Sequence, residues 1–336
     1  MTGSAEGGPE ESRHPFISVI VPVRNGARHL PRLLESLNEN DYPGDRREIV
    51  VVDHASQDGT AALARQAGVT VVSADRGPVG ALRNLGVREA RGSILAFVDA
   101  DHQVGPRWLR AAAAGLGPSD VAIVGDLCRA PVDGNWVQHT FDLLRARVDE
   151  PRDVTWLGSG NMAMARTAFE AVGGFDESLE VCEDVDLCQR VIDNGWRIRA
   201  EPGMHNVHFG DPATLGAVVR GERWRGRDNL RVSFRQRPPV RAWPGILMPV
   251  AGLLALAGAA AGLLLTPWVG PLPLFVSLGV LVAIVALRTL VLMSRGSRIN
   301  PIALGQSIAV ASAFELGRAL ALVAGASHDT RRGSRR

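Results

Sequence analysis

The sequence predicts an α/β fold with a doubly wound, mostly parallel sheet, followed by C-terminal transmembrane helices. Short apolar segments alternate with helix-like segments between residues 16 and 100, and this alternation is typical of parallel βαβ units. Beyond Ile246 the chain is almost free of charge over long runs, as membrane-spanning helices are. The length of 336 residues allows one large or two moderate domains. We therefore expect a soluble domain followed by a membrane region.

The overall composition indicates which partners and which cysteine chemistry to expect. The chain has 37 Lys and Arg against 35 Asp and Glu, a formal net charge of +2, which argues against nucleic acid as a partner. Its three cysteines have no Cys-x-x-Cys spacing, so we expect free thiols rather than a zinc site or a disulfide framework. Residues 1–14 are small, polar and acidic without an apolar core, which predicts a disordered lead-in rather than a signal peptide.

Strands and helices are expected to alternate as far as a central strand. The expected strands cover residues 16–23, 48–53, 69–73 and 93–98, and the expected helices cover residues 28–38, a segment through Leu63, and residues 80–90. Neither a Walker loop nor a Gly-x-Gly-x-x-Gly follows the first strand. Phosphate binding is therefore expected to use a metal and arginine instead of a glycine-rich loop.

The central strand ends in two carboxylates, Asp99 and Asp101, with His102 beside them. Ligands of open α/β sheets bind outside the carboxyl ends of the strands, which is where this pair falls. Carboxylates one residue apart point the same way in an extended chain, so each raises the cost of ionising the other. A divalent cation such as Mg²⁺ would remove that cost. The alternative is that both residues only cap the helix that follows.

Further motifs follow one another in a fixed order. They are Pro22-Val-Arg-Asn, Val52-Asp53 with Ser56-x-Asp58-Gly-Thr, Arg83-Asn84 with Gly86, Phe97-Val-Asp99-Ala-Asp101, Gly160-Asn-Met-Ala-Met, Phe169-x-x-Val-Gly-Gly-Phe-Asp-Glu and Glu183-Asp184-x-Asp186-Leu-x-x-Arg190. The ordered set, over about residues 16–209, resembles the family 2 glycosyltransferases of the GT-A fold. The resemblance implies a GT-A type sheet and transfer of a sugar from a nucleotide-sugar donor.

The resemblance also implies roles for residues on the donor side. Pro22 and Asp53 would contact the nucleotide, with Asp53 accepting hydrogen bonds from the base, and Arg83 would reach the phosphates. Asp99 would bind the ribose or share the metal. The metal, Mg²⁺ or Mn²⁺, would be held by Asp101, Asp99 and His208. Arg24 and His54 depart from the usual family pattern near the base and ribose, so the choice of nucleotide stays open.

On the acceptor side, the acidic pair Glu183 and Asp184 is the expected catalytic pair. The start of a helix keeps a carboxylate ionised and able to accept a proton. Asp186 is expected to face elsewhere and to pair with Arg190. The resemblance implies that Asp184 is the base and that Glu183 orients the acceptor or its loop, while simple helix capping by both is the alternative.

Two segments after the soluble core are expected to contact the acceptor or the membrane. Residues 136–148 are amphipathic and predict a helix over the acceptor cleft. Arg220-Gly-Glu-Arg223-Trp224 resembles the Gln-x-x-Arg-Trp signature of processive polysaccharide synthases, with Arg in place of Gln. Arg223 and Trp224 would then bind the acceptor or the diphosphate. The same segment also fits a membrane-surface helix with arginines facing anionic lipid, and the chain has too few spans for processive synthesis.

The membrane region begins with two segments, residues 246–265 and 272–293, that are long enough to cross the ~30 Å hydrocarbon core. Arginines precede the first and follow the second, at Arg231, Arg235, Arg237, Arg241, Arg295 and Arg298. The positive-inside rule then puts the soluble domain in the cytoplasm. Residues 301–326 carry Ser307, Ala311, Glu315 and Arg318 on one face. We expect an interfacial or re-entrant helix there, or else a third span with a buried Glu315–Arg318 pair.

The expected domains are a lead-in (1–14), a GT-A domain (15–212), an amphipathic interfacial or linker segment (213–243), a membrane region (244–326) and a basic tail (327–336). The expected protein is a multi-pass enzyme of the inner or plasma membrane. It would transfer a single sugar, with inversion, to a lipid-linked or membrane-proximal acceptor at the cytoplasmic face. The alternatives are a polyprenyl-phosphate glycosyltransferase and a non-catalytic, nucleotide-sugar-binding scaffold of a membrane assembly.

Overall fold

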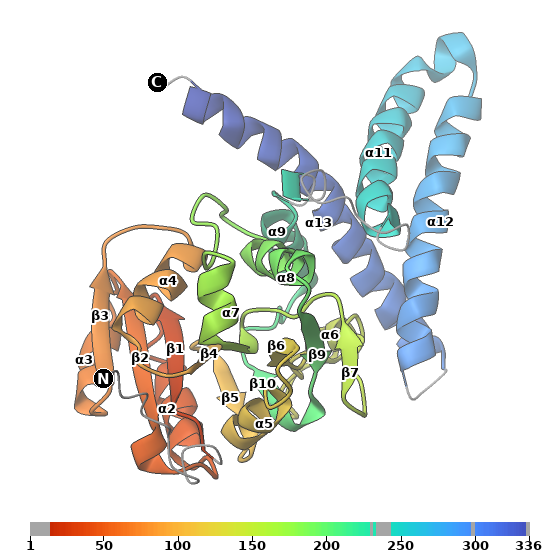
Figure 1. The fold of residues 1–336 in the computed structure, drawn as a ribbon. Coiled ribbons are helices and arrows are strands. Elements are labelled where there is room, and N and C mark those ends of the chain that lie inside the picture. The colour runs from red at the N-terminus through yellow and green to blue at the C-terminus, as the bar shows by residue number, and fades with distance from the viewer. Residues whose placement is uncertain (1–13, 229–230, 233–242, 297–299, 334–336) are drawn as a thin grey trace. The chain divides into compact units, whose positions relative to one another are not determined.

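The computed structural model describes residues 14–228, 231–232, 243–296 and 300–333 (Figure 1). Residues 1–13 of the predicted lead-in, the arginines at 235, 237, 241 and 298, and the last three residues of the predicted basic tail lie outside the described residues. The chain divides into two compact units, Met1–Pro131 with Ala146–Gly210, and Val132–Arg145 with Asp211–Arg336. Residues 132–145, which we expected in the soluble domain, belong to the second unit.

The first unit is built on a mixed sheet of eight strands. In sheet order they are β3 (Thr70–Ala74), β2 (Arg47–His54), β1 (Ile17–Val23), β4 (Ile94–Val98), β8 (Asn161–Ala165), β6 (Val121–Gly125), β9 (Arg197–Ala200) and β7 (Arg152–Val154). The first four strands in this order are parallel, while β8 runs antiparallel to both of its neighbours, β4 and β6. The predicted α/β class with a mostly parallel sheet is confirmed.

Helices cover both faces of this sheet, so β1 and β4 are buried over their whole length. One face packs against α2 (Leu30–Asn38), α3 (Thr60–Gln66) and α5 (Trp108–Gly115), and the other against α4 (Val79–Glu89), α7 (Arg166–Ala171) and α8 (Glu183–Asp193). Side chains alternate between the two cores along β1, where Val19 and Val21 face one core and Ile20 faces the other. Burial on both faces explains why these strands are continuous apolar runs.

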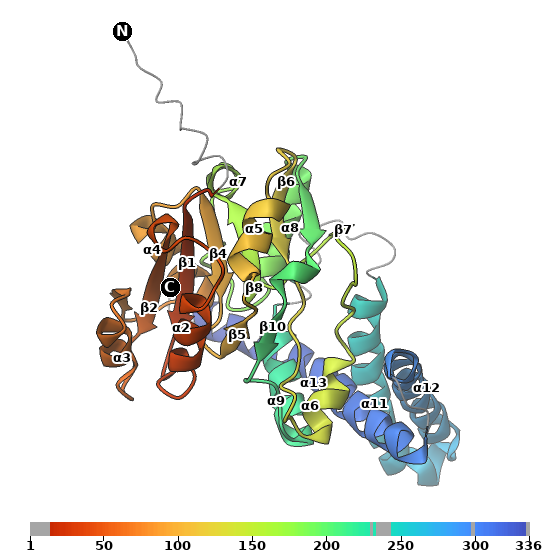
Figure 2. The same cartoon turned by 90° about the horizontal axis from the view of Figure 1, so that it is seen from below.

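A small second sheet brings distant residues to the end of β4. Strands β5 (His102–Val104) and β10 (Asn206–His208) pair antiparallel, with His208 opposite His102, and they lie side by side in Figure 2. Two short 3-10 turns, Gly44–Arg46 and Pro202–Met204, complete the unit. The backbone N–H of Phe209 donates to the carbonyl of Asp101 over 2.9 Å. The chain is thereby fixed next to the second aspartate of the Asp-x-Asp motif.

The second unit contains α6 (Trp136–Asp142), α9 (Leu215–Arg225), α11 (Trp243–Val269), α12 (Leu272–Arg295) and α13 (Pro301–Gly333). Three helices, α11, α12 and residues Pro301–Val323 of α13, are long and apolar enough to cross a membrane. Within this unit α11 and α12 run side by side, while α13 runs obliquely to them (Figure 1).

One prediction for this unit needs correction. The helix expected over 136–148 ends at Asp142, where the chain turns and Arg145 donates from the same guanidinium to Asp142 (2.9 Å) and Asp211 (2.7 Å). The third apolar segment is one continuous helix, and whether it spans the membrane or lies at its surface stays a prediction.

The buried face of α13 contains Ser307, Ala311 and Glu315, as the sequence predicts. The partner of Glu315 is different from the expected one. Arg288 of α12 donates to the Glu315 carboxylate over 2.7 Å, whereas Arg318 donates to the carbonyl of Gly245. Arg288 also lies 4.7 Å from the centroid of the Phe314 ring. A charge on one apolar helix is therefore neutralised by the opposite charge on its neighbour, which avoids an isolated charge in an apolar setting.

We expect the close packing of α13 on α9 to depend on Gly317. A Cβ at this position would lie 2.7 Å from the carbonyl oxygen of Val219 and from Cβ of Glu222. Gly317→Leu should destabilise the detergent-solubilised chain by about 1–3 kcal/mol through overpacking. Gly305→Leu is the matched control on the same helix, because nothing lies within 4 Å of its added Cβ. Equal thermal unfolding curves for the two variants would contradict this packing.

Candidate active site

The candidate site lies at the edge where β1, β2 and β4 end. β2 lies on one side of β1 and β4 on the other, so the strand order reverses at β1, and crevices of this kind hold ligands in open α/β sheets. Three residues other than glycine adopt left-handed backbone there or before α8: Asn25 (φ 52°), Ala55 (φ 48°) and Cys182 (φ 63°). Such strain persists only where the surroundings enforce it, and it clusters at functional sites.

Asp53, the last residue but one of β2, has an unused acceptor. Its side chain is 5% exposed, and Oδ2 accepts from the backbone N–H of Ser56 over 3.3 Å. Oδ1 is buried and has no hydrogen-bond partner. A buried carboxylate oxygen without a donor is costly, so a ligand N–H at this position would be stabilising. This is the environment that the predicted contact with a nucleobase requires.

The loops after β1 and β2 are held together by hydrogen bonds around Asn25. Its backbone N–H donates to Ser56 Oγ over 2.8 Å, and its Oδ1 accepts from the N–H of Gln57 over 2.9 Å. Pro22 precedes this loop, is buried within β1, and pairs in register with Val52. Its contact with a nucleotide stays a prediction.

Arg83 of α4 connects the two acidic motifs. One guanidinium nitrogen donates to Asp99 Oδ1 over 2.7 Å and the other terminal nitrogen to Glu183 Oε1 over 2.8 Å. The Arg83 side chain is 2% exposed and also lies 5.6 Å from the Phe175 ring centroid. Burial alone would lower the pKa of Arg83, but the neighbouring carboxylates outweigh it and raise this pKa. Arg83 therefore acts here as a bridge between carboxylates, and its predicted contact with phosphate stays a prediction.

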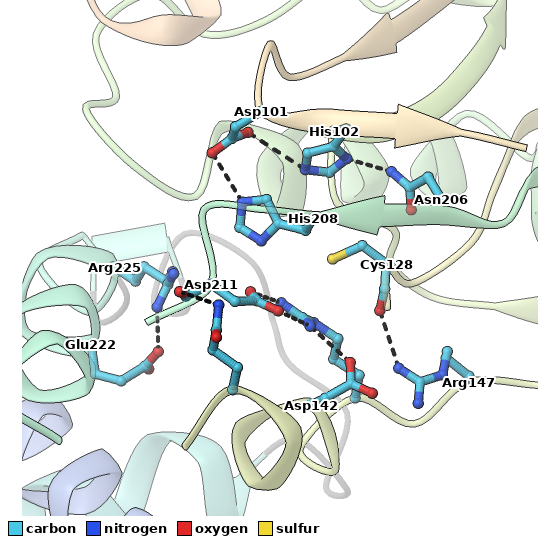
Figure 3. A network of polar contacts seen from close by, with 12 residues as sticks. Asp101, His102, Cys128, Asp142, Arg147, Asn206, His208, Asp211, Glu222 and Arg225 are labelled. Carbon is cyan, nitrogen blue, oxygen red and sulfur yellow. Dashed lines mark hydrogen bonds and ion pairs between the residues drawn. The ribbon is translucent and has the colours of Figure 1, made fainter. Parts of the chain in front are cut away.

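Asp101 and His208 form the candidate metal centre (Figure 3). His208 Nε2 lies 3.2 Å from Asp101 Oδ2. Gly210 leaves space beside the carboxylate, because a Cβ there would overlap Asp101 Oδ2. Burial opposes ionisation of Asp101, yet the hydrogen bond and charge of His208, together with His102, lower its pKa to about 2. An ionised carboxylate with a converging imidazole suits Mg²⁺ or Mn²⁺, so the residues present fit the predicted cation.

Asp99, the other predicted ligand, is directed differently. Its Oδ1 is used by Arg83, and its Oδ2 faces Gly160, where a Cβ would come within 2.7 Å. His102 lies next to Asp101, with Nε2 3.9 Å from Asp101 Oδ1. The grouping of three potential ligands therefore contains Asp101, His102 and His208 and does not include Asp99.

The second acidic pair begins α8. Glu183 accepts from Arg83 and also from Ser159 Oγ over 3.1 Å, so its position is fixed from two sides. Asp184 accepts from the backbone N–H of Val185 over 2.8 Å and from that of Ser159. Burial and the adjacent Glu183 raise the pKa of Asp184 to about 7, against the opposing effect of Arg83. A carboxylate with such a pKa can both accept and release a proton near neutral pH.

The remaining predicted residues can be placed as follows. Asp186 pairs with Arg190 at 2.7 Å, as predicted. The three cysteines are free thiols, also as predicted. Arg223 and Trp224 are exposed on α9 in the second unit, and their role stays a prediction. The sequence motif around residue 160 includes Asn161, but sequence reasoning assigned no side-chain role to Ser159, Asn161 or Asn206. Polar residues inside otherwise apolar buried segments are the signal that could have identified the last two.

Comparison with known proteins shows similarity to glycosyltransferases. Residues 18–172 match the family model described as glycosyl transferase family 2. The chain is 26% identical to the glycosyltransferase AglE of Haloferax volcanii, over 68% of this chain and 77% of that protein. It is 28% identical to the pre-mycofactocin glycosyltransferase of Mycobacterium tuberculosis, over 58% of this chain but only 43% of that protein.

A solved structure shows the same fold. The mannosyltransferase PcManGT of Pyrobaculum calidifontis, in complex with GDP-Man and Mn²⁺, superposes with a TM-score of 0.56 at 20% identity. The match covers 93% of this chain and 89% of that one. The predicted GT-A fold is confirmed.

The Arg83 bridge gives a testable difference in stability along α4. Arg83→Leu leaves two carboxylates without their shared cation and should destabilise the folded chain by about 3–5 kcal/mol. Arg88→Leu on the same helix removes an exposed pair with Glu177 at 3.9 Å and should cost less than about 1 kcal/mol. Thermal or denaturant unfolding in detergent micelles measures both. A loss for Arg83→Leu no larger than for Arg88→Leu would show that the bridge does not stabilise the fold.

Proposed function

Because residues 18–172 of this chain match the model of glycosyl transferase family 2, we propose that the protein transfers a single sugar, with inversion, from a nucleotide sugar to a membrane-associated acceptor. The observation that carries the proposal is the Arg83 bridge. It brings the Asp-x-Asp end of β4 and the Glu-Asp start of α8 to one side of the sheet. A donor-binding motif and a candidate base are thus held together within one unit.

The donor would lie across the ends of β1, β2 and β4. Asp53 Oδ1, buried and without a partner, would accept from an N–H of the base. Asp101 and His208 would hold a divalent cation, which when bound supplies Lewis-acid stabilisation of the departing diphosphate. Mn²⁺ in the PcManGT complex is in keeping with such an ion.

The acceptor side is proposed to depend on Asp184. Inversion requires the acceptor hydroxyl to attack the anomeric carbon from the face opposite the leaving diphosphate. As the new C–O bond forms, the hydroxyl proton passes to a base, and the bond to the diphosphate breaks with its electron pair. Asp184 has the raised pKa that this role needs. Glu183, held by Arg83 and Ser159, would orient the acceptor or its loop.

The acceptor is proposed to be lipid-linked or membrane-proximal. Three helices of the second unit are apolar enough to cross a membrane, and Arg295 ends α12. By the positive-inside rule, we propose that the catalytic unit faces the cytoplasm, where nucleotide sugars are present. Arg223 and Trp224 of α9 would contact the diphosphate, the acceptor or the lipid surface. A lipid phosphate as the acceptor itself, as in a polyprenyl-phosphate glycosyltransferase, is the second candidate.

A non-catalytic scaffold is the contrasting function. The acidic residues of both motifs are present, and burial with the adjacent Glu183 raises the pKa of Asp184, a shift that is typical of catalytic groups. A scaffold has no need of a base. Screening sugar nucleotides for release of nucleoside diphosphate by the purified full chain separates the two functions.

Turnover of the donor should depend on a divalent cation held by Asp101. Chelation should abolish release of nucleoside diphosphate, and Mg²⁺ or Mn²⁺ should restore it. Asp101→Asn should weaken both cation and donor binding, because a neutral amide neutralises no charge on the metal. Asp120→Asn is the matched control, since Asp120 is exposed and pairs with Arg197 at 2.7 Å. Full activity in excess chelator would contradict the proposed metal dependence.

The pH dependence should report on Asp184. A base must be ionised to accept a proton, so turnover should rise with pH and level off above about 7, the raised pKa of this carboxyl. Asp184→Asn keeps the size of the side chain but removes the base, so turnover should fall about 10²-fold or more with the donor still bound. Initial rates over a pH series, together with donor binding by calorimetry, measure both effects. If Asp184→Asn is nearly as active as the unchanged chain while Glu183→Gln is inactive, the base is Glu183.

A further inference from the structure

His102 could complete a zinc site that the proposed function does not need. Asp101, His102 and His208 offer ligand atoms that all lie within 4.8 Å of one another. One carboxylate with two histidines is a ligand set of catalytic zinc sites. A site that binds a nucleotide-bridged Mg²⁺ or Mn²⁺ instead keeps few protein ligands, because phosphate oxygens and water supply the rest. Whether His102 can be a ligand depends on which ring nitrogen carries its hydrogen.

A buried chain of hydrogen bonds determines which ring nitrogen of His102 carries the hydrogen. The chain begins at Trp108. The indole Nε1–H can only donate, and it donates to Asn161 Oδ1 over 2.6 Å. The amide nitrogen of Asn161 must then face the other way. There it meets only acceptors: the carbonyls of Asp126 (3.0 Å) and Met204 (2.8 Å), and Oδ1 of Asn206 (3.1 Å).

The orientation of Asn206 follows from that of Asn161. Its Oδ1 is used as the acceptor, so its Nδ2–H₂ faces His102 and donates to Nδ1 (Figure 3). A ring nitrogen that accepts carries no hydrogen, so the hydrogen of the His102 ring lies on Nε2. Trp108, Asn161, Asn206 and His102 are each less than 5% exposed, so water does not compete for these bonds.

The Nε2 of His102 lies 3.9 Å from Asp101 Oδ1, and Asp101 is the proposed ligand of the cation. A nitrogen that carries a hydrogen has no lone pair for a metal. We propose that the chain from Trp108 through Asn161 and Asn206 excludes His102 from the ligand set and prevents a two-histidine zinc site from forming. His102 instead presents an N–H toward the Asp101 carboxylate and positions it. This inference rests on the proposed cation site. It adds a reason why that site would bind Mg²⁺ or Mn²⁺ rather than Zn²⁺.

The hydrogen bond from Asn206 to His102 Nδ1 runs in the opposite direction to the hydrogen bonds that support metal-bound histidines. In those, the second ring nitrogen donates to a carboxylate or carbonyl, which leaves the first nitrogen free to bind the metal. Asn206→Asp would create that pattern. Its carboxylate would still accept from Asn161 and would now accept from His102 Nδ1, which leaves a lone pair on Nε2. The variant should therefore gain a metal ligand.

The experiment measures metal binding by the full chain in detergent micelles, without donor and without turnover. Zn²⁺ affinity is obtained by competition with a chromophoric chelator, and the d–d absorption of bound Co²⁺ reports the ligand set. The single substitution His102→Gln should leave the Zn²⁺ affinity within about threefold of that of the unsubstituted chain. Asn206→Asp should bind Zn²⁺ about 10-fold to 100-fold more tightly, the range found for outer-shell partners of metal-bound histidines. The Co²⁺ spectrum should change with it.

Two controls separate ligation from added charge. The gain should disappear in the double variant Asn206→Asp/His102→Gln, which keeps the new charge but has no imidazole. Gln103→Glu adds a charge at an exposed position on the same strand and should leave Zn²⁺ affinity unchanged. A gain that persists in the double variant overturns the proposal, and so does an Asn206→Asp variant that binds no more tightly.

One further result would overturn the proposal even if Asn206→Asp does not fold. A loss of Zn²⁺ affinity of about 10-fold or more in His102→Gln would show that His102 is already a ligand. The cation site itself is tested separately by Mn²⁺ binding to Asp101→Asn. If that binding is unchanged, the proposed metal site fails, whatever the result for His102.

Discussion

The buried Arg83 guanidinium is the interaction on which the rest of the site depends. Asp99 follows β4 and Glu183 begins α8, and without Arg83 the buried Glu183 and the partly exposed Asp99 would both lose their counter-ion. Burying an ion costs several kcal/mol unless its charge and hydrogen bonds are compensated. The start of α8 is therefore fixed to the end of β4 through α4. Ser159 adds a second contact to Glu183, so the donor and acceptor motifs are positioned by one network.

Two carboxylates near this network, those of Asp101 and Asp184, have pKa values that are shifted in opposite directions. Asp101 lies outside it, next to His208, and its pKa falls to about 2, which suits a metal ligand that must stay ionised. Asp184 lies next to Glu183 in a desolvated position, and its pKa rises to about 7, which suits a group that must take up a proton. Environments that push the pKa values of two acids apart are how one site assigns different roles to them.

The fold class and the local motifs could be predicted from the sequence, because both depend on the order of polar and apolar residues over short stretches of the chain. The continuous apolar runs of β1 and β4 identify strands covered on both faces, and the spacing from Asp186 to Arg190 identifies their ion pair. Long-range pairing is not encoded in this way. The partner of Arg83 at Glu183 is 100 residues away, and Arg288 rather than Arg318 neutralises Glu315. Such partners follow from helix packing, which no local pattern specifies.

The second unit shows the same dependence of a local feature on packing. The hydropathy of α13 permits a membrane span, yet the helix also packs against α9, where Gly317 lets the backbones approach closely. A helix that served only as a lipid-facing anchor would not need buried Glu315 or this contact. The packing fixes the orientation of α9 and so determines which of its residues are exposed. The exposed side chains of Arg223 and Trp224 therefore extend from a helix that is held in place by a helix–helix interface.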